Sequence, residues 1–239
     1  MVLMYVARFA AATLFMFAFP LAVVLTMVLS ITFDQGYYMR GYAKNEVTQT
    51  TGMSVAELSE ATRQVQAFFR GGPPVSLIVR KEWGREILFN SREQQHLVDV
   101  RGLFDLVGLG QILSIVYMII AAIVVLLIGR SRGARTLARW VTAGSALMLG
   151  IFALVGVLAL GDFQALWTQF HLVSFSNDLW LLDWRTDYMI RLWPLGFWFG
   201  AVTDVVIRSA VAAILALVIA QIYLRRTPRR ASVPALATT

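Results

Sequence analysis

The sequence has no cysteine, only two histidines and few charged residues. The missing cysteine excludes a disulfide framework, a thiol nucleophile and a cysteine-ligated metal site. With His96 and His171 as the only histidines, a histidine-rich metal site is not expected, and we predict neither a metal nor another cofactor. Charged residues make up 15% of the chain, against roughly 25% in soluble domains. The 58% hydrophobic content also excludes a disordered chain and disfavours a soluble enzyme.

The hydrophobic residues are concentrated in four long runs. Each run is long enough to cross about 30 Å of hydrocarbon at 1.5 Å per helical residue. The runs cover residues 9–33, 106–129, 137–160 and 197–224. The first run, at about 25 residues, exceeds the 7–15 of a signal-peptide core, so we interpret it as an uncleaved anchor. We therefore predict an all-α membrane protein with four transmembrane helices.

The distribution of charge predicts the orientation of these helices. Nine cations stand without any acidic partner in the first residues, the second linker and the tail (Arg8, Arg130, Arg132, Arg135, Arg139, Arg225, Arg226, Arg229 and Arg230). Residues 34–105 carry nine cations and nine anions, and residues 161–196 carry two cations and four anions. By the positive-inside rule, both termini are cytoplasmic and these two loops lie outside. The excess of positive charge is therefore explained by the orientation of the helices in the membrane, and nucleic acid is not an expected partner.

The outer loops are predicted to be mostly helical. Residues 54–70 form a helix that starts with a capping box of Ser54 and Glu57, and residues 75–89 form a small β-hairpin. A helix starting at Asn90 or Ser91 continues without a breaker into the second span. Asp162 caps a helix to about residue 176, and a short helix covers 184–192. Residues 1–226 thus form a single integral membrane domain, followed by a disordered cytoplasmic tail, 227–239.

Both histidines occur just outside a span, on the same predicted side of the membrane. Glu93, His96 and Asp99 share one helical face, so a carboxylate could hold the imidazole tautomer. His171 and Asp178 are likewise spaced along one face. The alternative interpretation is that each histidine is an interfacial residue whose ring is satisfied by a backbone carbonyl.

These residues carry a resemblance to a known family. Residues 90–104 and residues 170–194 resemble the two signature blocks of the lipoprotein intramolecular transacylase (Lit) family, although Trp184 and Leu195 depart from the expected pattern. The resemblance implies a multi-pass protein of the bacterial cytoplasmic membrane with its active site at the outer face. It implies a diacylated lipoprotein as substrate, and transfer of the sn-2 acyl chain to the α-amino group of the N-terminal cysteine. It also implies that His96 and His171 are catalytic, and we therefore expect them to converge on one pocket at the outer face, although about 75 residues separate them in the sequence.

This chemistry is compatible with the residues present. An α-amino group with a pKa near 8 must lose a proton before it attacks an ester, and a histidine is a suitable base. A second histidine can protonate the leaving glyceryl oxygen. Further candidates for support, for substrate binding or for stabilising the oxyanion are Asp99, Glu93, Arg101, Asn177, Asp178, Tyr37 and Tyr38, and the two tyrosines could equally be interface anchors.

The fourth predicted span contains two charged residues. Asp204 and Arg208 are four residues apart, so we expect an intramembrane ion pair that faces the bundle interior. This pair either locks the packing or forms the polar floor of a lipid-binding cavity. Two alternative functions remain open: a membrane esterase that uses the same histidines with water as acceptor, and a non-catalytic lipoprotein chaperone or scaffold. A transporter is disfavoured, because only one span carries buried charges and no pair of spans resembles inverted broken helices.

Overall fold

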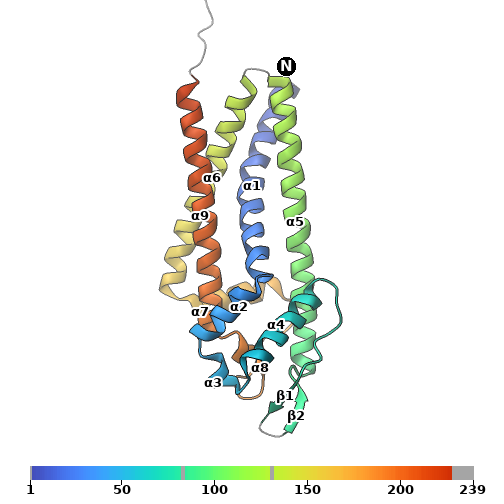
Figure 1. The fold of residues 1–239 in the computed structure, drawn as a ribbon. Coiled ribbons are helices and arrows are strands. Elements are labelled where there is room, and N and C mark those ends of the chain that lie inside the picture. The colour runs from blue at the N-terminus through green and yellow to red at the C-terminus, as the bar shows by residue number, and fades with distance from the viewer. Residues whose placement is uncertain (1, 82–83, 130–131, 228–239) are drawn as a thin grey trace, which may run out of the picture.

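A computed structural model describes residues 2–81, 84–129 and 132–227. Four long helices form an elongated bundle, and a smaller domain built from the two loops covers one end of it (Figure 1). The elements in chain order are α1 (Val2–Thr32), α2 (Gln35–Lys44), α3 (Val47–Thr51), α4 (Val55–Phe69), β1 (Ile78–Lys81), β2 (Gly84–Ile87), α5 (Ser91–Gly129), α6 (Gly133–Gly161), α7 (Phe163–Ser174), α8 (Tyr188–Leu192) and α9 (Leu195–Arg226). The predicted all-α class with a small hairpin is confirmed.

The bundle consists of the four helices that are long and apolar enough to cross a membrane: α1, α5, α6 and α9. Helix α1 packs against the other three, and α6 also packs against α5 and α9. Gly144 permits the close approach of α6 to α1, since a Cβ atom there would lie 3.1 Å from the side chain of Phe19. Most large apolar side chains of the bundle point outward, as expected for a surface that contacts lipid.

Helix α5 is longer than any membrane requires. Its 39 residues span about 58 Å at 1.5 Å per residue, against about 30 Å of hydrocarbon. Its apolar part, 106–129, belongs to the bundle, and its first turns extend into the loop domain (Figure 1). The predicted continuation of an outer helix into the second span is therefore confirmed. One rigid element carries His96 from the membrane into the loop domain.

The loop domain has its own hydrophobic core. Its centre includes Leu58 from α4, Leu88 after the hairpin and Leu192 from α8, each at most 1% exposed. The predicted capping box at Ser54 and Glu57 is formed, and it starts α4 at the expected residue. Gln66 of α4 donates a hydrogen bond to the carbonyl of Thr32, 3.0 Å away, which joins the domain to the end of α1. The loop domain is thus anchored directly on the bundle.

Some elements differ from the sequence-based expectation. Helices α2 and α3 were not predicted, because the two glycines and three threonines of 35–51 give this segment low helix propensity. Helix α2 is stabilised by burial of Tyr37, Tyr38 and Tyr42 against α9 and the α8 region. Helix α7 ends at Ser174, and α8 begins only at Tyr188. The hairpin turn at 82–83 and the predicted tail beyond Thr227 lie outside the described residues.

Candidate active site

His96 and His171 lie next to one another although 75 residues separate them in the sequence. His96 is in the second turn of α5 and His171 is in the last turn of α7. Their ring centroids are 6.2 Å apart, with an angle of 31° between the ring planes. Both side chains are buried, at 6% and 9% exposure. The fold therefore brings together two imidazoles that the sequence places in separate loops.

The ring of His171 is held in a defined tautomer. Its Nδ1 lies 2.8 Å from the carbonyl oxygen of Trp167, which can only accept a hydrogen bond. Nδ1 must therefore carry the proton, and Nε2 of the neutral ring is left with a free lone pair. Trp180 packs on the same ring at a centroid distance of 5.0 Å, and Trp167 contacts it edge-on at 4.8 Å. The ring of His171 is therefore held by a hydrogen bond at Nδ1 and by packing against two tryptophan rings.

The ring of His96 is held by packing alone. Phe175 contacts it edge-on at a centroid distance of 5.0 Å. Its buried Nδ1 has no hydrogen-bond partner within residues 2–81, 84–129 and 132–227. Leaving a buried polar atom unpaired costs about 1–3 kcal/mol, so Nδ1 is available to a bound substrate or water. The carboxylate that was expected to set the tautomer of His96 does not do so.

Burial keeps both histidines neutral. His96 lies in the part of α5 that projects beyond the apolar run, where burial and then the neighbouring His171 lower its pKa to about 4. Burial also lowers the pKa of His171, against the opposing effect of its hydrogen bond to Trp167. At neutral pH each ring can therefore accept a proton, as a general base must.

Two polar contacts attach the segment after α7 to the face of α5 that carries His96. The side-chain amide of Asn177 donates to Oδ2 of Asp99 at 2.9 Å. The guanidinium of Arg92 donates to the backbone carbonyl of Asp178 and lies 3.7 Å from its carboxylate. Arg92 and Asp99 are four residues before and three residues after His96, so they flank it on one helical face. Asp99, Asn177 and Asp178, which were predicted to support the histidines, therefore lie near the pair. Arg92 was not predicted, although its position four residues before His96 could have indicated it.

Glu93 has a different environment from the one expected. It is fully buried, and its carboxylate accepts hydrogen bonds from the backbone N–H groups of Asn90, at 2.8 Å, and Met189, at 2.6 Å. It therefore completes a capping box with Asn90 at the start of α5 and fixes the start of α8. The amide of Asn90 also donates to the buried Asp187, at 2.8 Å. The bonds from Asn90 to Asp187 and from Met189 to Glu93 join segments nearly 100 residues apart, and they hold the two loops together.

The other proposed oxyanion donors lie away from the histidines. The guanidinium of Arg101 packs over the ring of Phe68, 5.2 Å from its centroid, on the α4 side of α5. Tyr38 is buried among aromatic rings that include Trp193 and Phe197. Tyr37 of α2 packs edge-on against Phe197 in the first turn of α9, and burial and then the charge and hydrogen bonding of Asp204 raise its pKa to about 12. No contact of these three side chains with either histidine is found in the part of the chain described.

The expected ion pair between Asp204 and Arg208 is not formed. Both residues belong to the described structure, yet the ion pairs found there do not include this one. Asp204 is half-buried beside Tyr37, and Arg208 is exposed. The reason is that α9 begins at Leu195 and its first turns pack against α2 and α7, so Asp204 lies where the bundle meets the loop domain. The Tyr37 hydroxyl, and not the Arg208 guanidinium, is the group whose pKa Asp204 raises.

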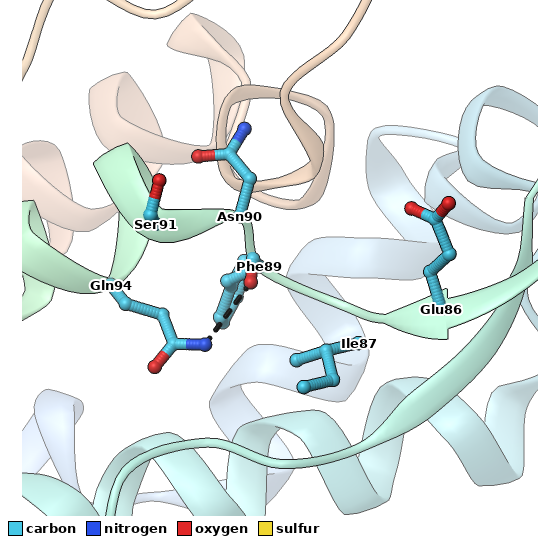
Figure 2. Close-up of a pocket in the computed structure, with 6 residues that line it drawn as sticks. All are labelled: Glu86, Ile87, Phe89, Asn90, Ser91 and Gln94. Atoms are coloured by element: carbon cyan, nitrogen blue, oxygen red, sulfur yellow. Dashed lines mark hydrogen bonds between the residues drawn. The ribbon is translucent and has the colours of Figure 1, made fainter.

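The histidines do not line the hollow shown in Figure 2. This shallow, open hollow of about 600 Å³ lies beside the hairpin and is lined by Glu86, Ile87, Phe89, Asn90, Ser91 and Gln94. Gln94 donates to the carbonyl of Phe89 there, at 3.2 Å, and Asn90 belongs to the network described above. Among the residues described, no three His, Cys, Asp or Glu side chains are grouped to hold a metal ion.

The fold and site define a class of membrane-integral protein: four apolar helices whose loops place two neutral histidines together at one end of the bundle. The family model for lipoprotein intramolecular transacylase Lit matches residues 13–198. That match covers most of the chain, so the chain belongs to this family of transacylases.

Solved structures agree with the fold. The chain is similar to the membrane-integral lipoprotein intramolecular transacylase Lit from Bacillus cereus, with a TM-score of 0.71 at 13% identity over 92% of this chain and 97% of that chain. Two variants of that protein, with a histidine replaced by arginine or by alanine, give TM-scores of 0.72 at 14% and 15% identity. Each comparison covers 94% of this chain, and 95% and 96% of the respective variant. None of the curated proteins matches the chain.

Proposed function

We propose that this protein moves the sn-2 acyl chain of a diacylglyceryl lipoprotein to the α-amino group of the lipoprotein's N-terminal cysteine. The amine nitrogen attacks the ester carbonyl and loses a proton, and a tetrahedral intermediate forms. Its collapse breaks the bond between the acyl carbon and the glyceryl oxygen, which takes up a proton. The product is an N-acylated lipoprotein with a monoacylglyceryl group, and no metal, nucleotide or other cofactor is required.

The observation that carries the proposal is the 6.2 Å separation of the two neutral imidazoles. The reaction removes a proton from nitrogen and delivers one to oxygen at atoms bonded to the same carbon. Two adjacent imidazoles can perform both transfers without moving. Because donor and acceptor belong to one substrate molecule, orienting them supplies part of the catalytic effect.

The difference between the rings supports an assignment of roles. His171 has its Nδ1–H bound to the carbonyl of Trp167, which presents Nε2 as a proton acceptor and increases its basicity. We assign His171 as the base that deprotonates the amine. His96, whose Nδ1 is unpartnered in the described structure, accepts and releases the proton near the glyceryl oxygen. Asp99 and Asn177 position the segment that carries Trp180.

The decisive experiment is co-expression with a diacylated lipoprotein, followed by mass spectrometry of the N-terminal lipopeptide. Intramolecular transfer gives an N-acyl, monoacylglyceryl peptide of unchanged mass, and its fragments in tandem mass spectrometry distinguish it from the diacylglyceryl peptide because the acyl chain stays on the cysteine nitrogen. Hydrolysis of the ester gives a free amine and the loss of one acyl chain, which would identify an esterase. An unaltered diacylglyceryl peptide would leave a binding or scaffold function.

The proposed location is the bacterial cytoplasmic membrane, with both termini in the cytoplasm and the histidines at the outer face. The chain lacks cysteine, so single cysteines report directly on access to a membrane-impermeant thiol reagent. Cysteine at the exposed Gln49 should react in intact cells, and cysteine at the exposed Arg132 should react only after lysis. The opposite pattern would invert the topology.

A further inference from the structure

The outward face of α7 is apolar, although α7 lies outside the four long helices. Phe170, Leu172 and Val173 are exposed, and Val173 is the most exposed of them at 87%. The opposite side of the same helix carries Trp167 and His171, which pack against α5 and α9. We define the exposed side as the outer face of α7: Leu172 and Val173, with Phe170 at its border, where Phe170 also stacks on Trp167 at a centroid distance of 5.1 Å. The segment that follows exposes two more large apolar side chains, Leu181 and Trp184.

No charge accompanies this face. Residues 163–176 contain no Asp, Glu, Lys or Arg. Helix α4, another amphipathic helix of the loop domain, carries Glu57, Glu60 and Arg63 and has the solvated face of an ordinary surface helix. Gln169, three residues before Leu172 and four before Val173, is also exposed on this side, but it is uncharged. An exposed, largely apolar surface without charges marks a site that contacts a partner or a membrane.

The chain connection places α7 at the end of a membrane-spanning helix. Helix α6 ends at Gly161 and α7 begins at Phe163, with Asp162 ending one helix and capping the other. The stack of Trp167 on Trp198, with centroids 4.7 Å apart, fixes α7 to the first turn of α9. Figure 1 shows α7 beside the lower ends of α9 and α2, at the level where the bundle meets the loop domain. Helix α7 therefore follows a membrane-spanning helix directly and lies at the end of the apolar bundle.

We propose that α7 is an interfacial helix whose outer face, Phe170, Leu172 and Val173, is inserted into the lipid bilayer. The partner is the acyl-chain boundary of the leaflet on the loop-domain side. A helix of this kind lies with its apolar face some 5–10 Å below the headgroups. His171, on the other side of α7, then sits beside the depth at which lipid esters occur. This last consequence rests on the proposed function, whereas the insertion of α7 does not.

The insertion can be measured without any catalytic activity. Single cysteines at Val173, Leu113 and Val55 are spin-labelled in the full-length protein, reconstituted in phosphatidylethanolamine–phosphatidylglycerol vesicles. Leu113 is an exposed residue in the apolar run of α5, and Val55 is an apolar loop-domain residue of 65% exposure, which makes it the matched control. Collision rates are measured with oxygen, which concentrates in the bilayer, and with a water-soluble nickel chelate.

The expected result is a label at position 173 that collides more with oxygen than with nickel, as at position 113, with the reverse at position 55. Nickel access at position 173 equal to that at position 55 would overturn the proposal, because the face would then be in water. Protection from both reagents would also overturn it, in favour of a protein partner. Lipopeptide analysis of the same preparations tests catalysis separately, so a protein without transacylase activity still reports whether α7 is inserted.

Discussion

The surroundings of His171 and His96 differ in how they hold an imidazole. His171 is fixed by a hydrogen bond to the Trp167 carbonyl and by two tryptophan rings. His96 is fixed only by packing, with an unpartnered Nδ1 in the described structure. The fixed tautomer of His171 is suited to a base that accepts a proton at one defined nitrogen. The ring of His96, which has no polar partner at Nδ1, is suited to a group that binds a proton only briefly. Similar burial can therefore serve two different roles.

Replacing either histidine should have the largest effect. His96→Ala and His171→Ala should each abolish most N-acylation, by roughly 100-fold or more, since general acid–base groups contribute about 10²–10⁴-fold. The double variant should be little worse than either single one, because groups that act as a unit lose their effect together. The ratio of N-acylated to diacylated lipopeptide measures this.

Gln95→Ala and Gln169→Ala serve as matched controls, since these exposed residues are near the histidines in sequence and outside the pair. Both should convert lipoprotein normally. Near-normal conversion by a histidine variant that is folded and membrane-inserted would remove the role assigned to that histidine.

The pH dependence should reveal the low pKa of His96. In the purified protein, the rate should decrease as pH falls from about 8, because the α-amino group of the substrate becomes protonated. A further decrease from His96 should appear only near pH 4, the value to which burial lowers its pKa. A histidine of ordinary pKa would add this second decrease near pH 6.5. Initial rates at constant ionic strength decide between the two profiles.

The same pKa shift has a consequence for stability. The unfolded chain binds a proton at His96 as pH falls below about 6.5, whereas the folded chain does so only near pH 4. Stability should therefore be lost between about pH 6.5 and pH 4, and His96→Gln should reduce this loss. An identical pH dependence of thermal unfolding in detergent for both proteins would contradict the low pKa.

Loosening the segment that orients His171 should have an intermediate effect. Asp99→Asn keeps a hydrogen-bond acceptor for Asn177 and removes the charge, so the loss of rate should be roughly 3- to 30-fold. That is smaller than the about 100-fold cost of misplacing reacting groups by 1 Å. Asp99→Ala, which removes the acceptor, should lose more. Equal rates for Asp99→Asn, Asp99→Ala and the unchanged protein would show that this contact does not position the site.

The smallest effect is expected far from both histidines, at Arg208. Since Arg208 is exposed and forms no ion pair within the described structure, Arg208→Leu should change the free energy of unfolding by less than about 0.5 kcal/mol. N-acylation should be unchanged. A loss of 2 kcal/mol or more, measured by thermal unfolding against the Gln169→Ala control, would indicate a partner for Arg208 that the structure lacks.

Much of the loop domain could be predicted where local chemistry is decisive. Ser54 and Glu57 start α4 as predicted, and Asp162 caps α7, because a capping side chain reaches backbone groups only two or three residues away. Helix α2 could not be predicted in this way, because its tyrosines are stabilised by rings from α9 that are distant in sequence. The hydrogen bond from Met189 to Glu93 could not be predicted for the same reason, because it depends on how α8 packs against the start of α5.

The sequence by itself determined the membrane class, the four spans and the two histidines as the residues of interest. These follow from long apolar runs and from rare residue types, and neither depends on distant contacts. The meeting of the two histidines was expected, but only the tertiary structure decided its geometry. Only the tertiary structure decided that Trp167 sets the tautomer of His171 and that Asp204 lies beside Tyr37 and not in an ion pair with Arg208. The physical reason is that a hydrogen bond or ring contact depends on ångström-scale positions, which are set by how α5, α7 and α9 pack together.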